Sequence, residues 1–346
     1  MTSSWEQRLI FTGWAMIVSG LVAIPGCASN PAPIPQPVSA TTAPADEDAV
    51  LHFTHETPGV PQPRQRVFTS PEEAAGVFKD AVLAKDRRTL FALFGDEGRQ
   101  LVFSGDRVQE DNDLQGFGQR LAEYLHVDRT SDNTAVIRIG QQNWPFPIPL
   151  VKSPDGWFFD TVAGRDELLN RHIGEDELNA IAVCRAFVQA QNEYIKKDRT
   201  GQGVAQYAQH LMSRPGARDG LYWEVGPSED LSPLGPLVAE ARAEGYPTTR
   251  SGNGQPRPYH GYIFHILQAQ GDAAPGGKMS YVVDDKMVKG FAMIAYPSKY
   301  GASGIMTFTV GKDGKVYQKD LGPETRQLAG EMTEYNPAPS WTEVKE

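Results

Sequence analysis

The first regular pattern of apolar and polar residues in the chain has a helical period. Apolar residues recur every three or four positions from Ala74 to Val82, which marks one buried helix face. Ser70 suits the N-cap of this helix, Pro71 its first position, and Glu73 the end of a capping box. Two further helices are predicted, over residues 86–94, ending near Gly95, and over residues 114–125.

The period then changes to two. Ala135, Ile137 and Ile139 alternate with more polar positions, which predicts a half-buried strand. The segments "WPFPIPLV" and "GWFFDT" follow, and the turn sequence "SPDG" joins them into a predicted β-hairpin.

The segment "WPFPIPL" (144–150) places three prolines two residues apart. Because proline cannot donate to a sheet ladder, the three should face one way. One interpretation is a polyproline segment displayed for a partner's groove. The other, which we favour, is an edge strand whose Trp144, Phe146 and Ile148 pack inward.

The second half of the chain begins with its longest helical pattern, residues 177–195. After a loop-rich middle, strands alternate with turns in the segments "YIFHILQAQ", "MSYVVDD", "GFAMIAYP", "GIMTFTV" and "KVYQKDL". In "PYHGYIFHI", His260 and His265 are expected on opposite faces of one strand, and the alternating Tyr and His on a face that contacts a partner.

These patterns predict an α+β protein of two domains, which suits a chain of 346 residues. Residues 66–173, helices followed by a curved sheet, resemble the nuclear-transport-factor-2-like and cystatin-like folds. Residues 174–346, a helix, an antiparallel meander, and a C-terminal helix and tail, resemble the globular head of type IV pilins and pseudopilins. The segment "GFAMIAYPSKYGASGIMTFTVGKDGKVYQKDLG" carries that second resemblance, although the long apolar first half of a pilin helix is missing.

The amino terminus predicts export. Residues 9–25 are apolar or small, and "IPGC" before "ASNP" resembles a bacterial lipoprotein signal. The resemblance implies a signal peptide over residues 1–26, lipidation of Cys27, and a membrane as the partner of that lipid; an uncleaved signal anchor is the alternative. Residues 27–65, rich in Pro, Ala, Ser and Thr, are expected to form a disordered tether. The resemblance places the body in the bacterial periplasm, and Ala28 after the cysteine favours the outer membrane.

The charge of the chain limits the macromolecules that it is expected to bind, and its cysteine content limits the disulfides that it can form. With 33 Lys+Arg against 43 Asp+Glu, the net charge is −10, and no basic block exists to neutralise phosphates, so no nucleic acid is expected. Cys184 is expected on the apolar face of the 177–195 helix as an inert buried thiol. With Cys27 lipidated, no disulfide is expected.

Candidate chemistry is sparse. The seven histidines form no HExxH pattern, and no nucleophile elbow, phosphate loop or dinucleotide motif occurs, so we predict no catalytic residue, metal or cofactor. Asp198 to Gly203 has calcium-loop spacing but one carboxylate, and a plain turn is favoured. The densest polar cluster lies at the predicted domain junction and comprises Asp160, Arg165, Asp166, Glu167, Arg171 and His172. It is either an ion-pair network, the favoured interpretation, or a ligand cleft.

Taken together, "FTSPEEA", "WPFPIPLV", "GWFFDTVAGRDELLNRHIG", "GLYW", "SPLGPLVAEARAEGY", "YHGYIFHILQAQGDAAPGG" and "FAMIAYPSKYGASGIMTF" resemble the DUF2950 family of exported bacterial proteins. The resemblance implies membership and no defined activity. We expect a non-catalytic binding or assembly module of the cell envelope, with an envelope protein as a candidate partner. The alternatives are a periplasmic hydrolase or small-ligand binder with a pocket in the first domain or at the junction, and a subunit associated with a pilus or secretion system.

Overall fold

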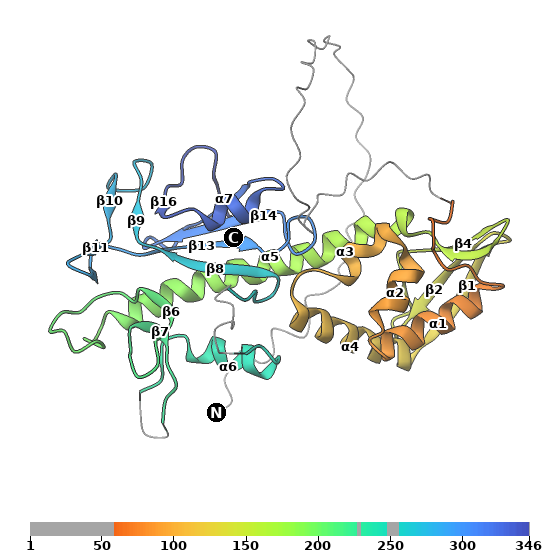
Figure 1. The fold of residues 1–346 in the computed structure, drawn as a ribbon, viewed down its shortest axis with the longest axis horizontal. Coiled ribbons are helices and arrows are strands. Elements are labelled where there is room, and N and C mark those ends of the chain that lie inside the picture. The colour runs from red at the N-terminus through yellow and green to blue at the C-terminus, as the bar shows by residue number, and fades with distance from the viewer. Residues whose placement is uncertain (1–58, 227–229, 248–255, 346) are drawn as a thin grey trace, which may run out of the picture. The chain divides into compact units, whose positions relative to one another are not determined.

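The computed structural model describes residues 59–226, 230–247 and 256–345 (Figure 1). The predicted signal peptide 1–26, Cys27 and most of the predicted tether 27–65 lie outside the described residues. The end of that tether needs correction, because Gln65 is buried and its Nε2 donates hydrogen bonds to the carbonyl oxygens of Leu93 at 2.8 Å and Phe159 at 2.7 Å. Ordered structure therefore begins before residue 65.

Helices come first along the described chain: α1 (Pro71–Leu83), α2 (Arg87–Phe94), the 3-10 turn η1 (Asp96–Gly98), α3 (Arg99–Val102) and α4 (Arg107–Glu123). The predicted start of α1 is confirmed, since the Ser70 hydroxyl accepts from the Glu73 amide at 3.1 Å. The prediction for α4 is wrong at its start. Asp106 caps this helix well before position 114 and is followed by polar turns that carry little apolar signal.

The first sheet contains β1 (Leu125–Ser131), β2 (Thr134–Ile139), β3 (Trp144–Pro145), β4 (Leu150–Ser153) and β5 (Gly156–Phe159). Its order is β1-β2-β4-β5, with β3 also paired to β2, and β4 and β5 form the predicted hairpin. Phe146 and Ile148 are buried, as the favoured interpretation of the proline segment expects, but Trp144 is only partly buried and residues 146–149 lie in no strand. The inward residues pack on α1, α2 and α4 as one hydrophobic cluster.

Helix α5 (Thr161–Tyr194) is one continuous helix of 34 residues. The prediction that it begins at residue 177 is wrong by about four turns, because the charged residues of its first half obscure the apolar stripe. Buried positions nevertheless continue along it, through Leu169, Ile173, Asp176 and Ala180. The helix therefore crosses the predicted domain boundary at 173/174 without a break.

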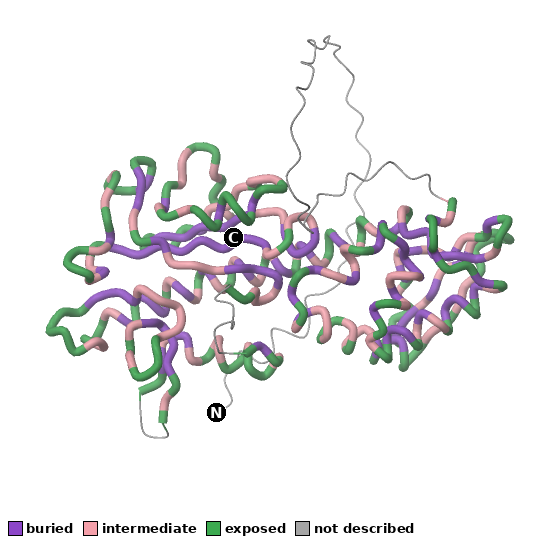
Figure 2. The backbone as a smooth tube through the Cα atoms, in the orientation of Figure 1, coloured by how far each residue is buried: buried purple, intermediate pink, exposed green. Residues whose placement is uncertain are grey.

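The second sheet is antiparallel, with the order β17-β15-β14-β13-β8. Its strands are β8 (Tyr262–Leu267), β13 (Ala292–Pro297), β14 (Met306–Gly311), β15 (Val316–Asp320) and β17 (Thr342–Glu343). Helix α5 packs on β13, β14 and β15, and the short α7 (Thr325–Gly330) contacts β13, which is buried along its whole length (Figure 2). A helix on an antiparallel meander is the arrangement that the strand pattern predicts, and the α+β class is confirmed.

The remaining strands form three small sheets: β6 (His210–Met212) with β7 (Gly220–Tyr222), β9 (Ala269–Gln270) with β10 (Met279–Ser280) and β16 (Glu334–Tyr335), and β11 (Val282–Val283) with β12 (Lys286–Met287). Helix α6 (Gly235–Ala243) follows β7 along the chain. Among the residues that the structure describes, no helix is both long and apolar enough to span a bilayer.

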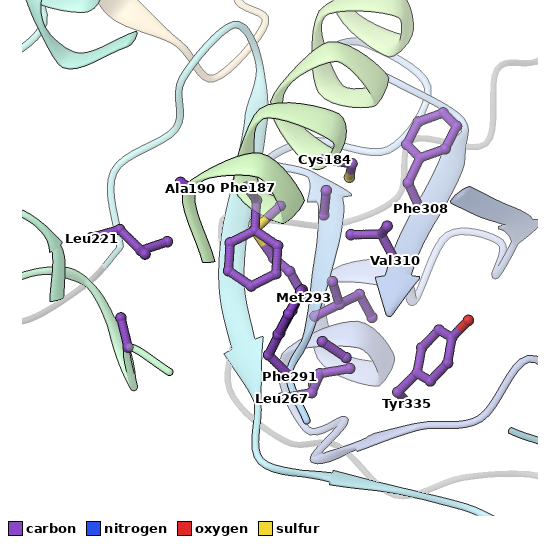
Figure 3. Packing of buried hydrophobic residues seen from close by; sticks show 14 of the residues in the cluster. Cys184, Phe187, Ala190, Leu221, Leu267, Phe291, Met293, Phe308, Val310 and Tyr335 are labelled. Carbon is purple, nitrogen blue, oxygen red and sulfur yellow. The ribbon is translucent and has the colours of Figure 1, made fainter. Parts of the chain in front are cut away.

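The second hydrophobic cluster lies between α5 and this sheet. Phe187 and Cys184 of α5 face the strands that carry Met293 and Phe308 (Figure 3). Cys184 is fully buried, and its burial raises the pKa of the thiol to about 12. The thiol therefore stays protonated and unreactive at neutral pH, as the sequence predicts.

Candidate functional site

The residues of the predicted polar cluster are spread along the first part of α5 and its N-cap: Asp160, Arg165, Asp166, Glu167, Arg171 and His172. Arg165 pairs with Glu97 of η1 and with Asp166, and Arg171 pairs with Glu167 one turn away. The Asp160 carboxylate accepts a hydrogen bond from the Gly59 amide at 2.8 Å. These contacts favour the ion-pair interpretation for Arg165, Asp166, Glu167 and Arg171, whereas Asp160 binds a backbone amide, and the cluster does not converge on one point.

His172, the sixth residue of the cluster, lies near a carboxylate of α4 instead. Its Nδ1 lies 3.7 Å from the Asp113 carboxylate on α4, and Asp113 lines a cavity of about 280 Å³. We call this cavity the acidic pocket. Its lining residues are Gln109, Asn112, Asp113, Glu175, Glu244, Tyr246 and His260.

The acidic pocket is built from three segments that are distant in sequence. Helix α4 supplies Gln109, Asn112 and Asp113, α5 supplies Glu175, and the segment after α6 supplies the rest. Three of the seven lining residues carry carboxylates, and none of the seven is Lys or Arg. The cavity wall therefore carries acidic groups and no Lys or Arg side chain.

Asp106 joins these segments. It is 1% exposed, and its Oδ1 accepts from the Val108 and Gln109 amides at 3.1 and 3.2 Å as the N-cap of α4. Its Oδ2 accepts from the Tyr246 hydroxyl at 2.9 Å and from the Gly261 amide at 3.1 Å. One buried carboxylate with four donors thus fixes the start of α4 to two points of the opposite wall.

A buried acid lies next to the pocket. Asp176 has no exposed surface, and its Oδ1 accepts a hydrogen bond from Gln109 Nε2. Its Oδ2 lies 3.4 Å from His172 Nε2. Burial raises the pKa of Asp176 to about 8 and lowers the pKa of His172. Both side chains are therefore neutral at pH 7, because a charged form would be poorly solvated there.

Gly261 makes the close approach to Asp176 possible. Its φ is +69°, and a Cβ at this position would lie 2.4 Å from Asp176 Oδ2 and 2.8 Å from the Ser303 Cβ. Glycine satisfies both the backbone conformation and the contact.

The opposite wall is partly aromatic. Tyr246 packs edge-on against Tyr259 with ring centroids 4.9 Å apart, and its ring lies 5.8 Å from that of His260. His260 Nε2 lies 3.0 Å from Glu244 Oε2. Burial raises the pKa of Glu244, and the neighbouring His260 partly offsets this effect.

Two predictions about this wall are wrong. His260 precedes β8 with a φ of 45°, so it does not share a strand with His265. Tyr262 is fully buried instead of lying on an exposed partner-contacting face, because β8 packs inside the second core.

A partly exposed carboxylate contributes less to the electrostatic potential of the pocket than a buried one, because water screens its charge. Partial enclosure and the charge of Glu175 raise the pKa of Asp113 to about 7, but 57% of the Asp113 side chain remains accessible and is screened by water. Asp113 therefore lies open to a ligand, and a cation beside it would favour its ionised form.

The predicted Asp198 loop forms a turn. The Asp198 carboxylate accepts hydrogen bonds from the amides of Thr200, Gly201, Gln202 and Gly203. Its oxygens are thus occupied by hydrogen bonds from backbone amides, as the turn interpretation predicts. Within residues 59–226, 230–247 and 256–345, no three His, Cys, Asp or Glu side chains are grouped so as to hold a metal ion.

Sequence reasoning did not bring the residues of the acidic pocket together. One signal was present: Asp176 occupies a position of the apolar stripe of α5, between Ile173 and Ala180. A carboxyl group in a core stripe needs partners or neutralisation, and both occur here.

Comparison with protein families places the chain. The model of the family described as "Protein of unknown function (DUF2950)" matches residues 65–344, so the chain belongs to this family. No curated protein and no solved structure matches it. The likeness of residues 174–346 to pilin heads stays a prediction.

Proposed function

We propose that this protein is a binding module that holds a small ligand in the acidic pocket and is anchored in the bacterial envelope by a lipid on Cys27. The observation that carries the binding function is the pair of hydrogen bonds by which Asp106 joins the two walls of the pocket. These hydrogen bonds to Tyr246 and Gly261 fix the two walls of the pocket before any ligand arrives. Preorganisation of this kind lowers the entropic cost of binding.

Binding is favoured over hydrolysis by the groups that face the cavity. The pKa of Asp113 is raised to about 7 and that of Asp176 to about 8, but Asp176 has no exposed surface, and the residues lining the cavity beside Asp113 include no Ser, Thr or Cys nucleophile. The groups that line the cavity are suited to recognition: three carboxylates, two amides and two rings.

The envelope location rests on the amino-terminal sequence. An apolar run, the "IPGC" segment and a Pro-rich stretch support export and acylation, and a multiply acylated cysteine would hold the protein at a membrane surface. Mass spectrometry of the mature protein should find a lipid-modified amino-terminal Cys27. A Cys27→Ala protein that still carries lipid and fractionates with membranes would refute this anchor.

The binding function can be tested on the full chain in detergent. Thermal unfolding is followed with a panel of small cationic, neutral and anionic compounds. At least one class should raise the melting temperature of the wild type, and Asp113→Asn should abolish that rise. Asp166→Asn is the matched control, since this carboxylate lies on α5 outside the pocket with 75% of its side chain exposed. A panel with no effect would contradict the proposed function.

A further inference from the structure

We infer that the ligand of the acidic pocket is a small organic cation, bound through an ammonium or guanidinium group among the carboxylates of Asp113, Glu175 and Glu244. This inference rests on the proposed binding function and names its ligand class.

Charge is the first argument. Three carboxylates line the pocket, and the one lining residue that can become cationic, His260, already has Glu244 as a neighbour at 3.0 Å. Asp176 and Asp106 do not line the cavity, and their oxygens accept hydrogen bonds from Gln109, Tyr246 and Gly261. An anionic ligand would disfavour the ionised forms of the three lining carboxyl groups, whereas a cation would stabilise them, that of Asp113 included.

A buried acceptor without a donor is the second argument. Gln109 lines the cavity and is 6% exposed, and its Oε1 has no hydrogen-bond partner among the described residues. Its Nε2 is held by Asp176, which fixes the orientation of the amide. A buried carbonyl oxygen left without a partner is costly, and an N–H donor on a ligand would satisfy it.

The aromatic wall is the third argument. Tyr246 and His260 line the cavity, and Tyr259 packs edge-on against the Tyr246 ring. Ring faces attract cations and pack against short alkyl chains. A carbon-bearing cation can use both the carboxylates and these rings, whereas a metal ion would use only the former.

Size is the fourth argument. At about 280 Å³ the cavity is far larger than one ion and lies just below the usual range for drug-sized ligands, about 300–1,000 Å³. This volume suits a diamine or a molecule the size of an amino acid.

Isothermal titration calorimetry of the full chain in detergent tests the inference. The probes are putrescine and agmatine as cations, 1,4-butanediol as the uncharged analogue, succinate as an anion, and calcium and magnesium chlorides. We expect saturable binding of at least one of the two cations at one site per chain, weakened by added salt, with no binding of butanediol or succinate. Glu175→Gln and Asp113→Asn should each weaken cation binding at least tenfold, and Asp166→Asn should leave it unchanged.

The other possible results of the titrations contradict the ligand class, the binding function, or both. Binding of succinate or butanediol in place of the cations would overturn the ligand class and leave the binding function intact. Calcium or magnesium binding that Glu175→Gln abolishes, without cation binding, would replace the organic cation with a metal. Absence of binding by every probe would overturn both the ligand class and the binding function. The side chains of Asp113 and Glu175 are exposed, so we expect both variants to melt near the temperature of the wild type. Such melting temperatures would show that the variants are folded.

Discussion

The carboxylate of Asp106 accepts a hydrogen bond from the hydroxyl of Tyr246 at 2.9 Å, across 140 residues of sequence. Tyr246 follows α6, and Asp106 begins α4, so this contact links the first half of the chain to the second. The acidic pocket lies beside it. Stability and binding therefore depend on the same buried group.

Asp106→Asn should destabilise the protein by about 3 kcal/mol. The amide of asparagine would present a donor to the Tyr246 hydroxyl or to the Gly261 amide, which are both donors in the wild type. Tyr246→Phe removes one of these bonds only and should cost about 1–2 kcal/mol. Urea unfolding of both variants measures the difference, and equal losses would argue against the proposed cross-link.

Substitution of Gly261 by alanine should lower the free energy of unfolding by more than the strain of a left-handed backbone alone explains. Gly277 is the matched control, with a φ of +74° and open space within 4 Å of the place that a Cβ would occupy. Gly277→Ala should cost about 1 kcal/mol. Gly261→Ala adds a contact of 2.4 Å with Asp176 Oδ2, so its loss in urea unfolding should be clearly greater. Similar losses at both positions would show that Asp176 does not pack against Gly261.

Stability should fall as the pH rises from about 6.5 to 8. The pKa of buried Asp176 is raised to about 8, so folding retains a proton that the unfolded chain has released above its ordinary pKa near 3.8. His172, whose pKa burial lowers, acts in the opposite direction only below about pH 6.5. The slope from Asp176 alone is at most about 1.4 kcal/mol per pH unit.

Asp176→Asn should flatten this slope, because an amide does not titrate. The neighbouring Asp113 acts with the same sign and more weakly, since 57% of its side chain is accessible. Urea unfolding at several pH values between about 6.5 and 8 measures both proteins. If the variant loses stability as steeply as the wild type, Asp176 is not the titrating group.

Local signals in the sequence predict much of the fold. Ser70 caps α1 through its side chain, Cys184 lies in the core, and the "SPDG" turn joins β4 to β5. Each of these features depends on residues close together in sequence, where propensity and periodicity are informative.

The acidic pocket could not be predicted in the same way. Asp106, Glu175 and Glu244 become neighbours of one cavity only through the packing of α4, α5 and the segment after α6. The charged run at residues 165–177 also hid the start of α5, because tertiary contacts to α3 and η1 hold these turns in place of an unbroken apolar stripe. Long-range contacts of this kind leave no periodic trace in the sequence.

Hydrogen exchange of the full chain, measured by mass spectrometry with and without a saturating concentration of putrescine or agmatine, whichever binds, tests whether the acidic pocket is the binding site. Ligand binding in the acidic pocket should slow amide exchange in residues 106–113, 244–247 and 256–261. The β4–β5 hairpin, which lies in the first sheet and supplies no lining residue, should exchange at the same rate in both samples. Unchanged exchange in those three segments, or slowing confined to other parts of the chain, would contradict the claim that this pocket binds the ligand.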